Sequence, residues 1–341
     1  MLRAQLRRIS LPASRHLSRT SLSKRTFSSY NSEAWISPVP VLKPTLWALA
    51  AVTTIYVGCA AIDVRRDVQD AKRRGAFEDG RVSSYKELEE AKYGNYRRHH
   101  RSHSPPAPKW QPSGQMGVIL SGYDDAEKVV IGAVALNIAA AGSSRFAPGL
   151  FAQYFTHWPL FSPNYTLLTS SFGHSGLLHL GLNSLALLSL GPWAASSHLF
   201  EGNGSHFGAF YLSAGILSSL GDHIATKLPT PGYRSHRFSP SMGSSGIIMA
   251  LLGVLVAMHP DYPISTLIPP GTYPMQNYVA ALTVFDLFGL IIGIPLMQLA
   301  HAAHLTGLGL GIAYVYYDGK KYIWRPSRMV AFSCMKRLHM I

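Results

Sequence analysis

Two polar groups in otherwise apolar parts of this sequence have the residue types of acyl-transfer chemistry. Ser245 opens an apolar segment inside the run Gly243-Ser244-Ser245-Gly246, and His304 lies in a later apolar segment. A serine hydroxyl is a poor nucleophile unless a neighbouring base accepts its proton. We therefore expect Ser245 to act as a nucleophile with His304 as its base, provided that the fold brings the two segments together.

A third polar group could stabilise the negative charge that such a reaction develops. It contains His174, His179 and Asn183, and the last two are four residues apart, on one face of a helix. A helix that begins at Ser245 also offers free backbone N–H groups and the positive end of its dipole. These N–H groups, together with the His179 and Asn183 side chains, could hold the oxyanion of a tetrahedral intermediate.

The elements that must position these residues are apolar segments of transmembrane length or slightly shorter. One such run covers residues 45–62, and six more follow it. The six lie near Val129–Ala141, Gly176–Leu190, Gly208–Ile224, Ser245–Met258, Tyr278–Ile292 and Leu299–Tyr316. This pattern predicts an all-α, polytopic membrane protein, in which one extra transmembrane helix at 45–62 precedes a six-helix core at 126–317.

Small residues follow one face of the fourth and of the sixth core segment. The two stripes are Gly246, Ala250, Gly253 and Ala257, and Ala300, His304, Gly307 and Gly311. Small side chains at this spacing let two helix backbones approach closely in lipid. The stripes could be packing surfaces alone. If they face each other, however, Ser245 and His304 come within hydrogen-bonding reach.

Composition narrows the classes of partner. The chain has 341 residues and a formal net charge of +14. Its basic residues lie mostly in the tails and in one loop, which favours anionic lipid head groups and an import signal over nucleic acid. Two cysteines, Cys59 and Cys334, make neither a disulfide framework nor a zinc cluster. We expect a lipid bilayer as a partner, and no nucleic acid, metal or cofactor.

The segments outside the core have distinct predicted roles. Residues 1–32 contain no acidic residue and are rich in Arg and Ser, which indicates a mitochondrial presequence, with cleavage after Phe27; a disordered basic tail is the alternative. We expect a soluble charged loop at 63–125, helix-prone over 63–92 and with a Pro-rich linker at 104–114, and a basic tail at 318–341. Counting seven spans places the two termini on opposite sides of the membrane and the serine loop on the amino-terminal side.

The polar groups together resemble the signature of the rhomboid family. That signature is a His-x4-His-x3-Asn helix, a Gly-x-Ser-Gly turn and an Ala-His-x2-Gly-x3-Gly helix. Here the same pattern occurs in the same order as His174/His179/Asn183, then 243–246, then 303–311. The extra amino-terminal helix, the presequence and the run 210–215 resemble the mitochondrial branch of that family.

The resemblance implies a six-helix rhomboid bundle and an intramembrane serine protease of the mitochondrial inner membrane. It implies peptide-bond hydrolysis by a Ser245–His304 dyad through an acyl-enzyme, with His179, Asn183 and the Ser245 N–H as the oxyanion hole. Its substrates would be membrane proteins with a single transmembrane helix. Supporting roles fall on His174, Gly243, Gly246, Gly307 and Gly311.

Several positions remain open. Ser244 competes with Ser245, although the family pattern places the nucleophile directly before Gly246. Asp286 lies inside a predicted span; we favour a buried structural hydrogen bond over a third triad member. His301 is interpreted as a structural neighbour of His304. Bacterial relatives carry Tyr where this chain has Met249, which could make a sulfur–aromatic contact instead.

One further departure and two rival functions stand beside this interpretation. Ser144-Arg145 replaces the Trp-Arg pair that many members carry in the loop after the first core helix. One rival function is a rhomboid-like scaffold that binds helices without cutting them. The other is a metal site or metal-dependent transporter built from His174, His179, His301 and His304.

Overall fold

The computed structural model describes residues 39–77, 81–99, 122–233, 236–267, 269–294 and 299–341, with the side chains of 93–99 and 267 excepted. The predicted presequence at 1–32 and the Pro-rich linker at 104–114 lie outside these ranges. Within them the chain is an all-α membrane protein with one small β-hairpin.

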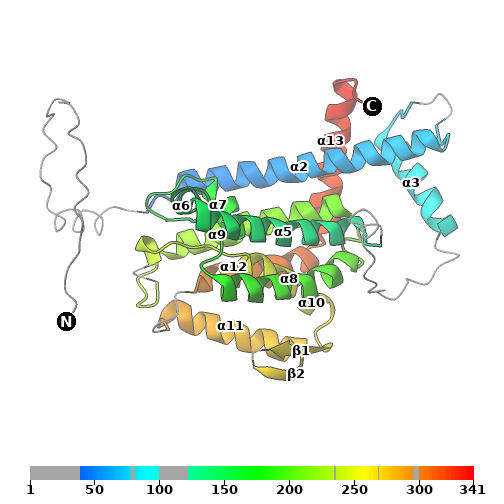
Figure 1. The fold of residues 1–341 in the computed structure, drawn as a ribbon. Helices are drawn as coiled ribbons and strands as arrows, with labels where there is room; N and C mark the ends of the chain where they lie inside the picture. The colour runs from blue at the N-terminus through cyan, green and yellow to red at the C-terminus, as the bar shows by residue number, and fades with distance from the viewer. Residues whose placement is uncertain (1–38, 78–80, 100–121, 234–235, 268, 295–298) are drawn as a thin grey trace, which may run out of the picture. The chain divides into compact units, whose positions relative to one another are not determined.

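Seven helices coincide with the seven predicted apolar segments (Figure 1). They are α2 (Leu42–Arg73), α5 (Asp125–Phe146), α8 (Leu177–Ser196), α9 (Gly204–Ala225), α10 (Ser245–Met258), α11 (Met275–Ile291) and α12 (His301–Tyr316). Among the described residues, α2, α5 and α8 are long and apolar enough to cross a membrane, while α10 and α11 are shorter apolar helices. The α10 bounds match the prediction at both ends.

Shorter elements connect and extend these helices. They are α3 (Tyr85–His99), α6 (Pro148–Phe155), α7 (Thr166–Thr169), η1 (Ser170–Phe172), η2 (His236–Phe238), η3 (Lys320–Trp324) and α13 (Arg325–Arg337). Strands β1 (Pro263–Leu267) and β2 (Pro270–Pro274) pair antiparallel, with Pro263 opposite Pro274. The hairpin was not predicted, because prolines at both strand starts obscure the alternating pattern of a strand.

Capping residues explain where two of the helices start. The Asp124 side chain accepts the Glu127 N–H at 2.7 Å, and Glu127 accepts the Asp124 N–H at 2.9 Å, so α5 begins in a reciprocal capping box. Asn203 caps α9 by accepting the His206 N–H at 2.9 Å. The sequence prediction placed both helix starts a few residues late because it followed only the apolar residues.

The charged segment at 63–92, which the sequence marks as helix-prone, contains the end of α2 and the start of α3, and the basic tail contains α13. Helix α2 continues past residue 62 to Arg73, because Val64, Val68 and Ala71 are buried on one face. That face packs in one cluster with Leu88 of α3 and with α13, where Phe332 and Met335 are buried. The charged residues of these segments therefore belong to amphipathic helices, which the charge counts alone concealed.

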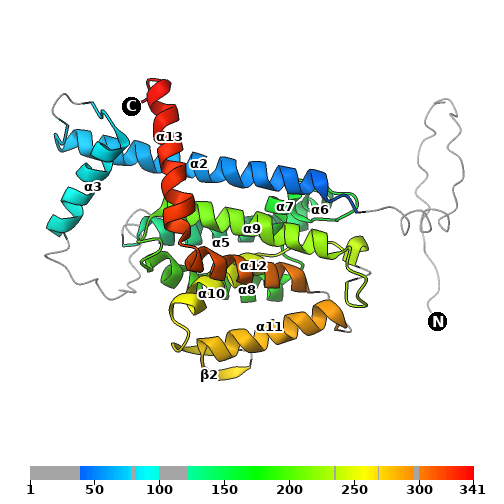
Figure 2. The same cartoon turned by 180° about the vertical axis from the view of Figure 1, so that it is seen from behind.

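A buried arginine on α13 binds carboxylates of α2, the first helix in the described part of the chain. Arg328 of α13 donates to Asp63 and, at 2.7 Å, to Asp67, both on α2. It also donates to Glu89 of α3 at 2.9 Å. Only 4% of the Arg328 side chain is exposed, and burial lowers its pKa to about 10, so it stays charged near neutral pH. Figure 2 shows α13 crossing α2.

Helices α10 and α12 approach through the two predicted glycine stripes. A Cβ at Gly307 would overlap the carbonyl oxygen of Gly246, and one at Gly311 would overlap that of Ala250. A Cβ at Gly253 would overlap the Leu308 carbonyl oxygen. The backbones are therefore in direct contact, as the spacing of small residues predicted.

The starts of α10 and α12, which hold Ser245 and His304, lie at the same end of the bundle. Ser245 at the start of α10 contacts His304 near the start of α12. At the carboxyl end of α9, His223 donates to the Pro40 carbonyl oxygen at 2.6 Å, just before α2. The serine therefore lies at the same end as the beginning of α2, in agreement with the span count, while Arg328 binds the far half of α2.

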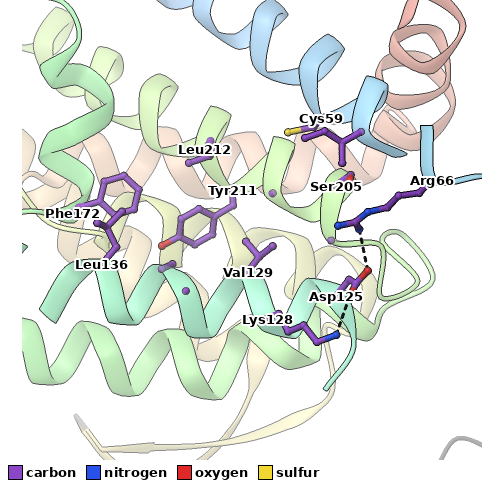
Figure 3. A pocket seen from close by; sticks show the side chains of 15 residues that line it. Cys59, Arg66, Asp125, Lys128, Val129, Leu136, Phe172, Ser205, Tyr211 and Leu212 are labelled. Atoms are coloured by element: carbon purple, nitrogen blue, oxygen red, sulfur yellow. Dashed lines mark hydrogen bonds and ion pairs between the residues drawn. The ribbon is translucent and has the colours of Figure 1, made fainter. Parts of the chain in front are cut away.

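A cavity of about 480 Å³ lies away from this end, among α2, α5 and α9 (Figure 3). Its walls are mainly apolar, and Tyr211 and Leu212 point into it from α9. At one rim, Asp125 binds Arg66 at 3.1 Å and Lys128 at 3.0 Å. Neither Ser245 nor His304 lines this cavity, so it is separate from the contact between those two residues.

Substituting Gly311→Ala should destabilise the protein, because the new methyl group overlaps the backbone of α10. Overpacking of this kind costs about 1–3 kcal/mol. Gly309→Ala is the matched control, since a Cβ there meets nothing within 4 Å. Thermal unfolding in detergent should show a lower midpoint for Gly311→Ala alone; equal midpoints would contradict the close packing of α10 on α12.

Substituting Arg328→Gln should remove the buried guanidinium that Asp63, Asp67 and Glu89 share and leave Lys92 as a remaining cation beside Asp63 and Asp67. Removing one partner from a buried ion pair costs about 3–5 kcal/mol. Arg325→Gln is the control, because Arg325 is exposed on the same helix. Unfolding monitored by circular dichroism should separate the two variants, and similar behaviour would count against the role of Arg328.

Candidate active site

The expected contact between Ser245 and His304 is present. The Ser245 Oγ lies 2.9 Å from the His304 Nε2. Ser245 is the first residue of α10 and is half-buried, whereas its neighbour Ser244 is fully buried. The Ser244 Oγ faces away toward His174, 3.5 Å from its Nε2. Of the two serines, only Ser245 combines partial exposure with a hydrogen bond to His304.

Asp286 completes a chain of three polar side chains across three helices. Its Oδ1 lies 3.0 Å from the His304 Nδ1 and 2.7 Å from the His301 Nδ1. A carboxylate only accepts hydrogen bonds, so each of these nitrogens carries the proton. The His304 Nε2 is then the acceptor, which orients it to take the proton of the Ser245 hydroxyl. The sequence predicted a structural hydrogen bond for Asp286, and the bond it makes is to the base itself.

His301 is buried beside this chain and shares its carboxylate. Only 2% of its side chain is exposed, and its ring lies where a Cβ at Gly289 would have to be. Gly289, one turn beyond Asp286 on α11, therefore lets the ring settle against the helix backbone. This arrangement agrees with the interpretation of His301 as a neighbour that supports His304.

The loop before Ser245 adopts a backbone that requires glycine. Gly243 has φ +126°, and its N–H donates to the Ser170 carbonyl oxygen at 2.9 Å. A Cβ at Gly243 would lie 2.9 Å from the His179 Nε2 and 3.8 Å from the Ser245 Oγ. The loop and the imidazole are packed too closely for a side chain, so Gly243 places His179 beside the serine.

Two more of the predicted polar residues, Asn183 on α8 and His174 before it, contact His179. The Asn183 Nδ2 donates to the His179 carbonyl oxygen at 3.0 Å, so in this structure the amide binds its own helix. The His174 ring meets the His179 ring edge to face, with centroids 5.0 Å apart. His174 is thus placed between Ser244 and His179. Oxyanion binding by His179 and Asn183 remains a prediction.

Two cavities adjoin Ser245 and Met249. A polar cavity of about 10 Å³ lies beside Ser245, and hydroxyl groups of α9 and of the preceding loops line it, among them Ser170, Ser218 and Ser241. A volume of this size accommodates about one water molecule. A second, groove-like cavity of about 320 Å³ lies between α8, α10, α11 and β1, and the buried Met249 lines it.

Comparison with known sequences identifies the family. The Rhomboid domain matches residues 163–321, a range that holds Ser245, His304 and Asp286. The chain belongs to the rhomboid family. It is 33% identical over 210 residues to the human presenilin-associated rhomboid-like protein, mitochondrial. The aligned residues cover 59% of this chain and 51% of the human protein. The chain therefore spans about half the length of the relatives it matches.

Other relatives of this rhomboid are also mitochondrial proteins. The zebrafish presenilin-associated rhomboid-like protein A, mitochondrial, is 30% identical over 211 residues, covering 60% of this chain and 51% of that protein. The yeast Rhomboid protein 1, mitochondrial, is 29% identical over 155 residues, covering 46% and 42%. With its membrane-capable helices, this rhomboid is a multi-pass mitochondrial membrane protein.

The structure places Ser144-Arg145, which the sequence comparison set against a loop Trp-Arg pair, in a helix. Ser144 and Arg145 lie in the last turn of α5, before the chain turns at Ala147, so they are not part of the following loop. That loop instead contains α6 and α7, and its His157 N–H pairs with the Ser241 carbonyl oxygen at 2.9 Å, next to the serine loop. The Trp-Arg comparison therefore aligned a helix end with a loop.

Proposed function

We propose that this rhomboid is an intramembrane serine endopeptidase, with Ser245 as nucleophile and His304 as base. The observation that carries the proposal is the 2.9 Å contact between the Ser245 Oγ and the His304 Nε2, inside the matched domain. A hydroxyl paired with an imidazole, at the start of a helix, has the geometry of an activated nucleophile.

The reaction runs in two steps. Ser245 Oγ attacks the carbonyl carbon of the scissile peptide bond while His304 Nε2 takes the hydroxyl proton. The tetrahedral intermediate collapses when His304 returns that proton to the leaving amine, which leaves an acyl-enzyme. Water then attacks the ester as His304 accepts its proton, and protonation of Ser245 Oγ releases the carboxylic acid and restores the enzyme. The small polar cavity beside Ser245 is well placed to hold that water.

The oxyanion of each tetrahedral intermediate would lie over the start of α10. Backbone N–H groups in the first turn of a helix have no partner inside the helix and attract negative charge. The Ser245 N–H is one of them, and the His179 Nε2 faces the same loop. Asn183 could join these donors if its amide turns from the α8 backbone. Preorganised donors of this kind are usually the largest contribution to acyl-transfer catalysis.

Asp286 acts as a positioning residue in this proposal. Its hydrogen bond to the His304 Nδ1 fixes the tautomer in which Nε2 is free to accept a proton. It also stabilises the positive charge that His304 acquires in the transition state. Asp286 makes no contact with a substrate in this scheme, and it acts on the reaction only through the imidazole.

The proposed substrates are inner-membrane proteins with a single transmembrane helix. The groove between α8, α10 and α11 is apolar, with Leu182 and Leu185 on one wall and Leu282 on the other, and suits a membrane segment. A helix hides its carbonyl groups in internal hydrogen bonds, so the segment must unwind locally before Ser245 reaches a peptide bond. Small or helix-breaking residues near the cleavage site would make that unwinding easier.

The alternative is a rhomboid scaffold that binds membrane helices without cutting them. The groove would serve that function equally well. The contacts of Ser245, His304 and Asp286 favour the protease, because helix binding alone gives no reason to place a hydroxyl, an imidazole and a carboxylate in one buried chain.

Replacing either reactive group should abolish proteolysis. Purified Ser245→Ala and His304→Ala should each reduce cleavage of a reconstituted single-span substrate by about 10⁴-fold or more. Ser244→Ala is the matched control, because its hydroxyl faces His174. Gel analysis of the products decides the matter: cleavage by both of the first two variants refutes the dyad, and loss in Ser244→Ala alone moves the nucleophile by one residue.

Replacing Asp286 should impair turnover more than binding. In Asp286→Asn the side chain keeps its shape but loses its charge and its control of the His304 tautomer, so kcat should fall by roughly 10²-fold or more while KM stays nearly constant. Steady-state kinetics with a fluorogenic transmembrane substrate separates the two constants. A KM change with an unaltered kcat would assign Asp286 a purely structural part.

A further inference from the structure

The site contains more ligating groups than the proposed reaction uses. Asp286, His301 and His304 each direct one potential metal-ligand atom to the same place, and these three atoms all lie within 4.8 Å of one another. Hydrolysis needs one histidine on Asp286, not two. His301 is nevertheless 2% exposed, and its second ring nitrogen has no hydrogen-bond partner among the described residues.

We propose that Asp286, His301 and His304 form an inhibitory Zn²⁺ site. Two imidazoles and one carboxylate are the donor set that suits zinc, and three protein ligands leave a fourth position for water. The inference rests on the proposed protease function, because it describes how that same site is switched off. It departs from the sequence prediction of no metal and from the rival four-histidine site, since neither His174 nor His179 belongs to this group.

The three side chains must adjust their spacing to hold the ion. A tetrahedral site with metal–ligand bonds of about 2.0–2.1 Å spaces its ligand atoms roughly 3.3 Å apart. Asp286 Oδ1 now lies 2.7 Å from the His301 Nδ1 and 3.0 Å from the His304 Nδ1. For the ion to replace the two protons, these two distances must widen by a few tenths of an ångström, and the two imidazole ligand atoms, which lie within 4.8 Å of each other, must take up the same spacing. Of the three side chains, that of His304 is the most exposed, at 15%, so the ion enters from the Ser245 side.

Binding would stop catalysis through the tautomer of His304. With zinc on Nδ1, the single proton of the neutral imidazole must move to Nε2. An Nε2 that carries a proton cannot accept one from the Ser245 hydroxyl, so the nucleophile is no longer activated. Asp286 is occupied by the metal at the same time and no longer orients the ring.

Direct metal binding can be measured without proteolysis. The test protein is full-length Ser245→Ala, purified without a histidine tag and carrying His99→Gln, His100→Gln and His103→Gln, because that histidine-rich run could bind the ion itself. Titration with Co²⁺ as a spectroscopic probe should give a tetrahedral absorption band that saturates at one equivalent and is displaced by Zn²⁺. A folded protein that shows no such band overturns the proposal without any further variant.

Variants then locate the site. In the same background, His301→Gln and Asp286→Asn should each weaken Co²⁺ affinity by at least about tenfold, while His174→Gln should leave it unchanged. Thermal melting checks that each variant is folded. A band that survives in both His301→Gln and Asp286→Asn, or that disappears in His174→Gln, refutes the assignment to Asp286, His301 and His304.

Activity assays separate this proposal from the proposed function. Wild-type protein should lose cleavage of its single-span substrate as Zn²⁺ is added and regain it with a chelator. If the metal-free enzyme does not cleave, the protease function fails, while the Co²⁺ titration still decides the metal site. If it cleaves and Zn²⁺ has no effect at concentrations that saturate the Co²⁺ site, inhibition is refuted.

Discussion

The direct contact between the backbones of α10 and α12 is the constraint on which the rest of this structure depends. In a bilayer no hydrophobic force draws two helices together, so close packing must supply the attraction. Gly246, Gly253, Gly307 and Gly311 allow the carbonyl groups of one helix to touch the other. The same approach brings the start of α10 against the first turn of α12. The distance between Ser245 and His304 is therefore a consequence of packing along the whole length of the two helices.

A third helix adds charge to this contact. Asp286 would be costly in the interior of a membrane protein if it lacked partners, and here it lies 2% exposed with two imidazoles bound to one of its oxygens. The chain of hydrogen bonds from α11 through α12 to α10 thus satisfies a buried carboxylate and orients an imidazole at once. The stability of the fold and the proposed chemistry depend on the same few hydrogen bonds, so a substitution that breaks one of them affects both.

The sequence predicted the spans, the facing glycine stripes and the Ser245–His304 contact, because each leaves a local pattern: apolar runs, small residues at helical spacing, and polar groups where lipid is expected. The partner of Asp286 could not be predicted, since nothing in the spacing says which way α11 faces. The packing of the charged segments could not be predicted for another reason. The sequence marks 63–92 as helix-prone, but Val64, Val68 and Phe332 are interspersed with many charges, so average hydropathy did not show that their apolar faces pack together.

The Arg328 contact has a consequence for the order of assembly. Its partners Asp63 and Asp67 lie on the first described helix, while the guanidinium comes from the last, so about 260 residues separate the groups that must meet. Closing so long a loop is slow and comes late in folding. Until α13 has folded, Asp63 and Asp67 lack the Arg328 guanidinium. Lys92 of α3 still lies 2.8 Å from Asp67, and Arg66 of α2 still binds Asp125 of α5 at 3.1 Å. A chain that ended before α13 would therefore retain all the proposed catalytic residues but lack the three carboxylate contacts through which Arg328 joins α2 to α3.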